Sequence, residues 1–339
     1  MDYRHSPRVD HLRRMTTSFG LIQHAVGSTP DPKFGYSIDD NARALIVCLD
    51  YAEVYGSNEL ADLEEIYFNF LARALTKDGY FHNFYSIDEQ PLDEKGSDDS
   101  YARTFWALAE SASRSKNEKI WKKASEIWKQ LDPSHHLSHS YLRTKSYILL
   151  GYGAMSDTRQ AQIWADQLVS LFKSNQTDDW QWFEESLTYC NAIPVYALSR
   201  AAEITKNPEY LTVAEQAFTW LDSVSRVDGI VAPIGQNGWY HHRRDKSIYD
   251  QQPVDTAKMV MAADKLFKLT GNKEYQEKAS EWMNWYYGSN TKKITMFDEA
   301  TNGVYDGLTP TGVNVNEGAE SIVTYLLAYL SLSNNSHEA

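Results

Sequence analysis

Apolar residues recur at helical spacing along nearly the whole chain, and polar loops of two lengths separate the apolar stretches. Over residues 8–26, for example, Leu12, Met15 and Phe19 stand three or four positions apart, which places their side chains on one face of a helix. Short turns such as Tyr55-Gly56-Ser57-Asn58 alternate with long polar loops. Counting the stretches gives about twelve helices in six pairs, at a period of roughly 40 to 65 residues.

Six antiparallel helix pairs, each with one more apolar member, can close into a ring of inner helices surrounded by outer ones. The pattern therefore predicts an all-α fold, an (α/α)6 toroid with long loops and small β-hairpins on one face. No linker interrupts the pattern, so we expect a single domain over residues 1–339. If the short turns lie on one rim, the long loops and the N-termini of the inner helices meet on the other.

Closure of the ring makes a further prediction about the two ends of the chain. The last inner helix, about residues 319–332, should lie beside the helix that begins at Asp40. Glu317 and Glu320 should then reach the same cavity as Asp39 and Asp40, within roughly 15 Å given helix spacings of about 10 Å.

Residues 35–46 join a polar loop that bears carboxylates directly to an apolar helix. Asp39 or Asp40 can cap this helix by accepting hydrogen bonds from its first N–H groups, and Arg43 lies one turn further in. The same kind of junction recurs along the chain. In a toroid it would place the following acids around one mouth: Asp39, Asp40, Asp98, Asp99, Glu184, Glu185, Asp250, Glu317 and Glu320.

Composition narrows the ligands that such a mouth would take. The net charge of −13 disfavours nucleic acid and anionic membranes, and the 10 Trp and 22 Tyr exceed what packing needs. Flat rings with a polar edge commonly line sugar sites. The N-terminus lacks the apolar core of a secretory signal and no apolar run is long enough to span a bilayer, so we expect a cytoplasmic protein. Cys48 and Cys190 are expected to be buried thiols and not a disulfide.

Two carboxyl groups on opposite sides of a glycosidic bond can hydrolyse it, one as acid and one as base or nucleophile. We assign these roles to Asp40 and Glu184, with Asp99 as the third candidate, and favour inversion because the acids come from separate inner helices. Each of them could instead be a helix cap or a ligand of a sugar hydroxyl. No cofactor or metal is expected.

The remaining candidates would bind substrate. Asp39 and Glu320 would hold hydroxyls, Arg43 and Arg103 would orient acids, and Trp180, Trp182, Trp239 and Tyr249 would offer stacking faces. The full set of expected binding residues is Tyr36, Asp39, Arg43, Asp98, Arg103, Trp180, Trp182, Trp239, His242, Tyr249, Gln251, Asn316, Glu317 and Glu320.

Other patterns keep alternatives open. His135, His136 and His139 have metal-like spacing, but no acid or cysteine nearby completes a site, so they are interpreted as loop histidines. His241 or His242 could be the base of a toroidal sugar epimerase. The paired aspartates could suggest a magnesium-diphosphate site, but they lack a helical i, i+4 repeat.

Several stretches together resemble one bacterial family. They are His11-Leu12, Gln23-His24-Ala25, Gly35-Tyr36 with 39–46, 97–100, Trp182-Phe183-Glu184, Leu187-Thr188-Tyr189, Asp250-Gln251-Gln252-Pro253, and 312–314 through 320–321. The family consists of proteins similar to toroidal glycoside hydrolases, found alone or attached to retaining glycosyltransferases. The resemblance implies an oligosaccharide ligand and a glycosyltransferase as partner, and it leaves a non-catalytic glycan-binding role open. Cys190 stands where the family pattern leads one to expect Asp.

Overall fold

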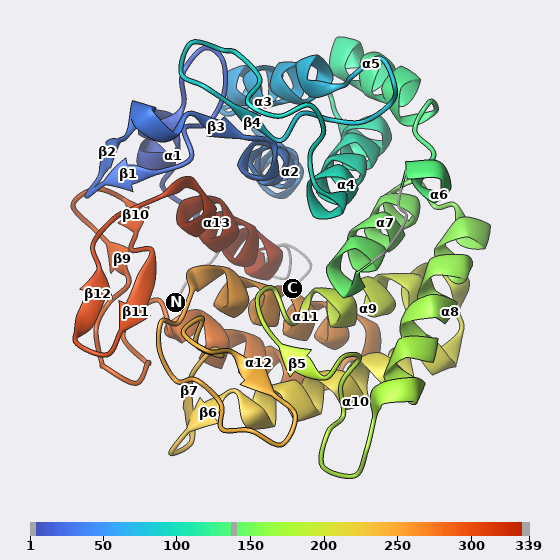
Figure 1. Cartoon of the computed structure of the whole chain (residues 1–339), viewed down its shortest axis with the longest axis vertical. Helices are drawn as coiled ribbons and strands as arrows, with labels where there is room; N and C mark the ends of the chain where they lie inside the picture. Colours follow the sequence, from blue (N-terminus) through green and yellow to red (C-terminus); the bar gives the residue numbers. More distant parts are fainter. Residues whose placement is uncertain (1–4, 137–140, 334–339) are drawn as a thin grey trace.

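The computed structural model describes residues 5–136 and 141–333, and these residues form a closed ring of helices (Figure 1). The inner helices are α2 (Ile38–Tyr55), α4 (Asp98–Arg114), α7 (Leu142–Ala154), α9 (Ile193–Thr205), α11 (Pro253–Thr270) and α13 (Ala319–Ser333). Each packs against the next, and α13 packs against α2. The predicted (α/α)6 toroid and its closure are therefore confirmed.

An outer layer surrounds the inner ring. It consists of α1 (Asp10–Met15), α3 (Ala61–Ala74), α5 (Glu118–Trp128), α8 (Thr158–Asn175), α10 (Pro208–Val224) and α12 (Lys273–Asn284), with the short α6 (Pro133–His136) between pairs. Outer helices bury one stripe: in α5 only Ile120, Ala124 and Ile127 are buried. Inner helices are covered on all sides, so most residues of α2 and α13 are buried.

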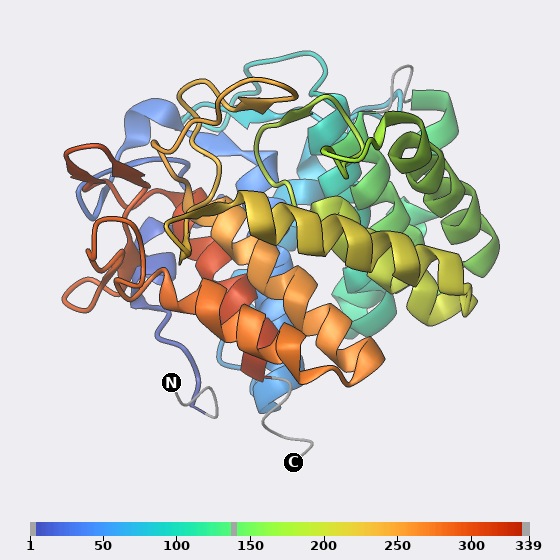
Figure 2. The same ribbon diagram turned by 90° about the horizontal axis from the view of Figure 1, so that it is seen from below.

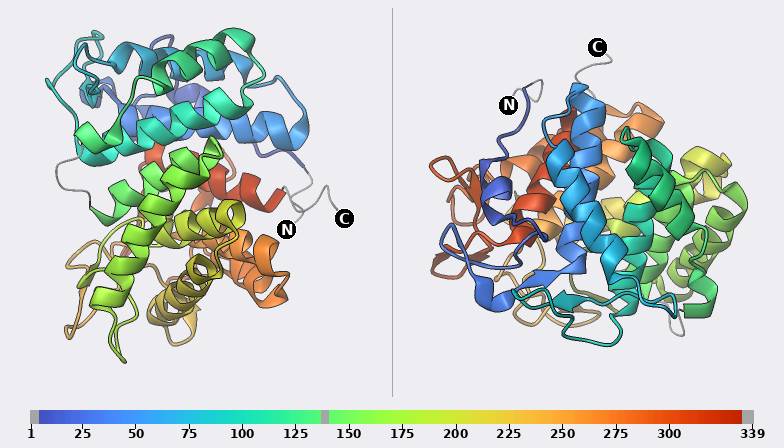
Figure 3. Two further views of the ribbon diagram at one scale, coloured as in Figure 1. Left: turned by 90° about the vertical axis from the view of Figure 1, so that its right-hand side faces the viewer. Right: turned by 90° about the horizontal axis from the view of Figure 1, so that it is seen from above.

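The long loops gather on one face of the ring, where the inner helices α2, α4, α11 and α13 begin (Figures 2 and 3). Two-stranded antiparallel pairs stiffen these loops: β1 (Ala25–Val26) with β2 (Thr29–Pro30), β3 (Tyr36–Ser37) with β4 (Phe84–Tyr85), β5 (Ser186–Leu187) with β8 (Tyr240–His241), β6 (Arg226–Val227) with β7 (Ile230–Val231), β9 (Phe297–Asp298) with β10 (Gly303–Val304), and β11 (Gly307–Thr309) with β12 (Gly312–Asn314). The pairs β3–β4 and β5–β8 tie together loops that are far apart in sequence. A 3-10 turn, η1 (Pro32–Phe34), leads into β3.

The first helix differs from the prediction. Residues 8–26 were expected to be helical, but α1 ends at Met15 and the chain then runs as a loop in which Thr16 bridges to Leu21. The Thr16 hydroxyl donates to the carbonyl of Leu12, and the Thr17 hydroxyl donates to the carbonyl of Gly20. These side-chain bonds favour a turn over a further helical turn, and the apolar residues beyond α1 are buried from a loop.

Pro194 marks a late helix start. Helix α9 begins at Ile193, with Pro194 in its first turn, where the missing N–H costs nothing. Cys48 and Cys190 are buried and free, as predicted. Within the described ranges, no helix has the length and apolar character needed to cross a bilayer.

Candidate functional site

A cavity of about 430 Å³ opens at the N-termini of α2, α11 and α13. This is within the usual size range of small-molecule sites, about 300 to 1,000 Å³. Its lining carries five carboxylates and otherwise mainly neutral polar groups: Gln23, His24, Ser37, Asp39, Asp40, Arg43, Phe84, Gln236, Asp250, Gln251, Gln252, Pro253, Val254, Asp306, Gly307, Thr309, Asn314, Gly318, Glu320 and Ser321.

Two carboxylates at the start of α2, those of Asp39 and Asp40, line this cavity. Ser37, and neither aspartate, caps the helix: its hydroxyl oxygen accepts a hydrogen bond from the backbone N–H of Asp40 at 3.2 Å. The expected cap by Asp39 or Asp40 is therefore wrong, because the helix begins at Ile38 and both acids lie inside its first turn. Ser37 also donates to Asp40 Oδ2 at 2.6 Å, which fixes that carboxyl group.

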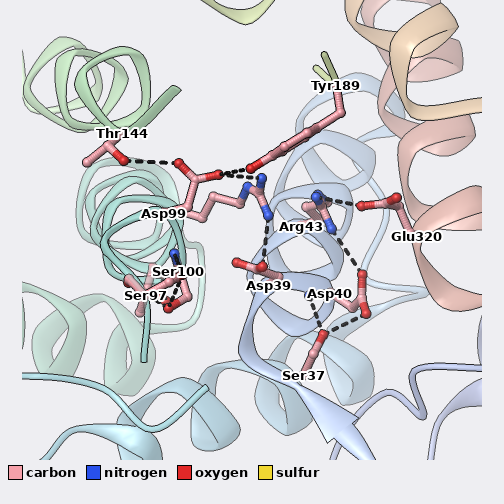
Figure 4. Close-up of polar contacts among 12 residues, drawn as sticks. Ser37, Asp39, Asp40, Arg43, Ser97, Asp99, Ser100, Thr144, Tyr189 and Glu320 are labelled. Atoms are coloured by element: carbon pink, nitrogen blue, oxygen red, sulfur yellow. Dashed lines mark hydrogen bonds and ion pairs between the residues drawn. The ribbon is translucent and has the colours of Figure 1, made fainter. Parts of the chain in front are cut away.

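Arg43 links the two ends of the chain (Figure 4). One terminal nitrogen contacts Asp40 Oδ1 at 3.0 Å, and the other contacts Glu320 Oε2 at 2.8 Å. One guanidinium thus holds an acid from the first inner helix and an acid from the last. The expectation that Glu320 shares the cavity of Asp39 and Asp40 is confirmed.

Burial decides the protonation of Asp40. The residue is only 4% exposed, and burial raises the pKa of its carboxyl group to about 6. The positive charge of Arg43 lowers this pKa and the negative charge of Glu320 raises it, but burial outweighs both. Asp40 can therefore carry a proton in a cavity that other carboxyl groups also line.

A second guanidinium extends the network across the ring. Arg103 contacts Asp39 Oδ2 at 2.9 Å and Asp99 Oδ2 at 3.1 Å. Asp99 also accepts hydrogen bonds from Thr144 at 3.0 Å and from the Tyr189 hydroxyl at 3.4 Å (Figure 4). Arg43 and Arg103 therefore orient acids, as the sequence predicts. Asp39 lines the cavity and Asp99 does not.

Asp306 is a site residue that sequence reasoning missed. Its Oδ1 accepts hydrogen bonds from the backbone N–H of Gly318 at 2.8 Å and from the Ser321 hydroxyl at 2.7 Å, at the start of α13. Burial raises the pKa of this carboxyl group. It follows β10 in a loop without helical periodicity, so only its Asp306-Gly307 turn pair marked it.

Asp255 was also missed. It lies in the first turn of α11, and burial raises its pKa to about 7. Its Oδ1 accepts from the backbone N–H of Asn191 at 3.1 Å and from the side chain of Asn191 at 3.2 Å. Asn191 in turn bonds to Thr188, so Asp255 anchors the turn that carries Tyr189.

Glu184 lies outside the cavity lining. Its pKa is raised by burial and lowered by the neighbouring Arg143 and the backbone N–H of Leu142, while Asp99 raises it further. Glu184 thus belongs with Asp99 on the α7 side of the ring, away from Asp40. Its catalytic role stays a prediction.

Two of the four expected stacking residues, Trp180 and Trp182, are buried. Trp180 and Trp182 are each 1% exposed, and Trp180 donates to the carbonyl of Glu184 at 2.7 Å, so neither can offer a face to a sugar. Tyr36 is equally buried and bonds to Thr17. Trp239 is half-buried, with its ring centre 6.3 Å from that of Tyr189.

Phe84 lines the cavity, although the sequence did not mark it as a binding residue. Tyr249 lies instead under Lys292, whose Nζ is 4.8 Å from its ring centre. The following residues, 250–254, line the cavity, but Tyr249 does not.

Three other expected binding residues, Gln251, Asn316 and His242, make contacts within and between the loops. Gln251 lines the cavity, but its amide is occupied by the carbonyl of Ile248 and the indole N–H of Trp285. Asn316 accepts from the backbone N–H of Gly27. His242 stacks on Trp180, with its ring centre 4.9 Å from that of the indole.

Glu317 and Asp98 also lie elsewhere. Glu317 accepts from the Thr301 hydroxyl at 2.8 Å and lies 3.5 Å from the His11 ring, so the expectation that it reaches the cavity is wrong. It precedes α13, whereas Glu320 lies in the first turn of that helix and points toward Arg43 (Figure 4). Asp98 borders a separate surface hollow beside Lys95 and Tyr101.

Within the described part of the chain, no group of three or more His, Cys, Asp or Glu side chains could hold a metal ion. His139 lies outside the described residues. The carboxylate network is therefore held together by arginines and hydroxyl groups.

This geometry defines a toroid with a polar, carboxylate-lined mouth, and known structures share the toroid. A cellobiose 2-epimerase from Bacillus thermoamylovorans superposes with a TM-score of 0.76 at 10% identity, covering 97% of this chain and 96% of that one. A D-mannose isomerase gives 0.71 at 13% identity, covering 97% and 96%. A family 76 α-mannanase from Bacteroides thetaiotaomicron gives 0.61 at 12% identity, covering 89% and 87%.

These likenesses at low identity establish the fold: the chain is an (α/α)6 toroid of the kind found in sugar epimerases, sugar isomerases and glycoside hydrolases. No family model matches the sequence, and no curated protein shows significant sequence similarity to it.

Proposed function

We propose that the protein is an enzyme that hydrolyses a glycosidic bond of an oligosaccharide in the 430 Å³ cavity, with Asp40 as the general acid. The observation that carries the proposal is the buried carboxyl group of Asp40, whose raised pKa of about 6 suits a group that must donate a proton. Glycoside hydrolysis needs one protonated carboxyl group as the acid and a second carboxyl group as base or nucleophile.

Asp306 is our candidate for the second carboxyl group. Two hydrogen bonds fix its Oδ1, whereas its Oδ2 has no hydrogen-bond partner among the described residues. Asp306 itself lines the cavity. Asp40 and Asp306 come from different segments, α2 and the link between β10 and β11, which favours a gap wide enough for water and hence inversion.

Asp40 and Asp306 together supply and remove the protons that hydrolysis requires. The Asp40 proton passes to the glycosidic oxygen as the C1–O bond breaks. Asp306 takes a proton from a water molecule whose oxygen forms the new bond to C1. Ser37 and Arg43 keep Asp40 in place through both protonation states, and the α13 N-terminus stabilises the charge of Asp306 before it accepts the proton.

Asp39 and Glu320 are positioned to bind sugar hydroxyls, since both line the cavity and each is already oriented by an arginine. Phe84 supplies an apolar face to the same space. Asp99 and Glu184 lie outside the cavity lining, and their catalytic roles stay predictions.

A sugar epimerase or isomerase is the second candidate, and His24 favours it. Among the described residues His24 is the one histidine that lines the cavity, so it could remove the proton next to a sugar carbonyl. Several similar toroids are epimerases or isomerases. The expected His241 and His242 are less suited, because they lie in a separate surface groove.

Product analysis on a panel of neutral oligosaccharides separates these functions. Cleavage with NMR detection of the first anomer formed tests hydrolysis and inversion, and a retained configuration would contradict inversion. An epimerised but uncleaved sugar would support His24 chemistry. Binding without turnover, unchanged in Asp40→Asn, would support a non-catalytic glycan-binding partner of a glycosyltransferase.

A further inference from the structure

A small antiparallel sheet continues the wall of the cavity toward solvent. Strands β3 and β4 pair so that Ser37 stands opposite Phe84. The chain then turns back: Tyr85 bridges to Pro91, and the backbone N–H of Leu92 donates to the carbonyl of Phe84 at 2.8 Å. Leu92 therefore stands opposite Phe84 on the far side of β4 from Ser37.

The two faces of this sheet differ in exposure. Residues opposite each other in antiparallel strands point to the same face, and neighbours along a strand alternate between faces. Tyr36 and Tyr85 lie on one face and are buried. Ser37, Phe84 and Leu92 lie on the other, where Ser37 and Phe84 line the cavity. Phe84 is 38% exposed and Leu92 is 63% exposed, so two apolar side chains lead from the cavity outward.

Phe34 adds a third exposed apolar side chain beside the cavity. It is 48% exposed, and its ring centre lies 4.7 Å from that of His24, which lines the cavity. Gly35 holds this turn against β4, because a side chain at this position would collide with a backbone oxygen of that strand. We call Phe34, Phe84 and Leu92 the apolar rim.

Asp93 fixes the two strands that carry Phe84 and Leu92. Its carboxylate accepts hydrogen bonds from the backbone N–H of Asn83 at 2.9 Å and from that of Phe84 at 3.4 Å. Its backbone carbonyl accepts a hydrogen bond from His82 Nδ1 at 2.6 Å. Because these bonds join the two strands, the apolar side chains are held beside the cavity before any ligand binds.

The chemistry of the apolar rim differs from that of the cavity. The cavity offers carboxyl and amide groups to sugar hydroxyls, whereas phenylalanine and leucine side chains neither donate nor accept hydrogen bonds. Leu92 also lacks a flat ring on which a sugar could stack, so a hydrocarbon group suits it better than a further sugar. The exposed Asp88, Glu89 and Glu94 on the same loop disfavour an anionic ligand or an anionic membrane.

We propose that the apolar rim binds an uncharged hydrocarbon aglycone of the substrate. The sugar enters the cavity, and the hydrocarbon group at its reducing end lies over Phe84 and Leu92. This inference rests on the proposed function, since it takes the ligand of the cavity to be a glycoside. It makes Leu92 a specificity-determining residue that lies outside the reacting groups.

NMR of the protein labelled at its leucine and valine methyl groups tests this site. Two signals are followed, that of Leu92 on the rim and that of Val254 in the cavity lining, each assigned by its loss in Leu92→Ser or Val254→Ile. The probes are the methyl and octyl glycosides of glucose, galactose and mannose, with the octyl compounds kept below their micelle concentration. A sugar that enters the cavity should shift the Val254 signal in both forms, and only its octyl glycoside should also shift that of Leu92.

Titration of the Val254 signal gives the affinities. The octyl glycoside should bind at least about tenfold more tightly than the methyl glycoside, which is the gain from removing about two methylene groups from water. Leu92→Ser should reduce this advantage to about threefold or less. The control Ile163→Ser removes an aliphatic side chain that is 44% exposed on the outer helix α8, and it should keep the full advantage.

The outcomes separate this inference from the proposed function. Methyl and octyl glycosides that shift Val254 equally, bind equally well and leave Leu92 unchanged would overturn the aglycone site and leave the proposed function standing. If no glycoside shifted Val254, both would fail. A Leu92 shift without a Val254 shift would show non-specific apolar binding and overturn the inference. So would a Leu92 shift with neutral phosphatidylcholine vesicles but with none of the octyl glycosides, which would assign the rim to a membrane surface.

Discussion

Replacing Asp40 by asparagine should stabilise the fold at neutral pH while it abolishes turnover. Asp40 is 4% exposed, and burial raises its pKa from 3.8 to about 6. Because the folded pKa lies above the unfolded one, the folded protein binds the proton more tightly, and ionisation of Asp40 opposes folding. This cost is absent below about pH 4, grows between pH 4 and 6, and is complete above pH 6.

The magnitude follows from the shift. A difference of roughly two pKa units corresponds to about 3 kcal/mol in the free energy of unfolding. An asparagine amide interacts less favourably with Arg43 than a carboxylate does, which reduces this gain by about 1 kcal/mol. The net gain is about 2 kcal/mol in the free energy of unfolding. At about 2.1 cal/mol/K per residue, a chain of 339 residues should then gain about 3 °C in Tm.

Thermal unfolding of the parent and of Asp40→Asn at pH 7.5 and pH 4 tests this. The variant should unfold at higher temperature at pH 7.5, and its advantage should vanish at pH 4. Asp62→Asn is the control with the opposite sign: its carboxylate is 60% exposed and paired with Arg13, so the variant should lose at most about 1 kcal/mol at pH 7.5. A lower Tm for Asp40→Asn at pH 7.5 would refute the reasoning, since the contacts with Arg43 and Ser37 would then outweigh burial.

Arg43→Met leaves Asp40 and Glu320 without their shared partner and should lower the free energy of unfolding in urea by about 3 to 5 kcal/mol. The control Arg13→Met, at an exposed ion pair, should lower it by about 1 kcal/mol or less. Equal losses in the two variants would contradict the bridging role of Arg43. Asp306→Asn should reduce kcat on the cleaved oligosaccharide by at least about a hundredfold with little change in Tm, and near-normal turnover would remove it from the mechanism. Ser37→Ala loses the cap of α2 and should cost about 1 kcal/mol, measured by the same unfolding assay, with no cost if another group caps the helix.

The sequence alone determined the architecture, because the local periodicity of apolar residues predicts the helix pairs of the toroid. Apolar residues recur at helical spacing, in the outer helix α5 along one stripe, and short turns alternate with long loops. These local features were enough to predict that the last helix, with Glu320, lies beside the first pair. The first helix was misjudged because hydroxyl groups of Thr16 and Thr17 bond to nearby carbonyls and favour a turn.

Only the tertiary structure decided which polar residues face the cavity. Asp39, Asp40, Arg43 and Glu320 could be found from sequence, since helix starts on one rim must converge. Loop residues have no periodicity from which the direction of a side chain can be predicted. The sequence therefore did not indicate that Trp180 is buried in the core or that Asp306 lines the cavity.

The protonation of Asp40 likewise depends on the tertiary structure. Its pKa reflects burial together with the charges of Arg43, one turn further along α2, and of Glu320 at the other end of the chain. Solvent exclusion and charge proximity are properties of the closed ring, and they arise only when α13 packs against α2.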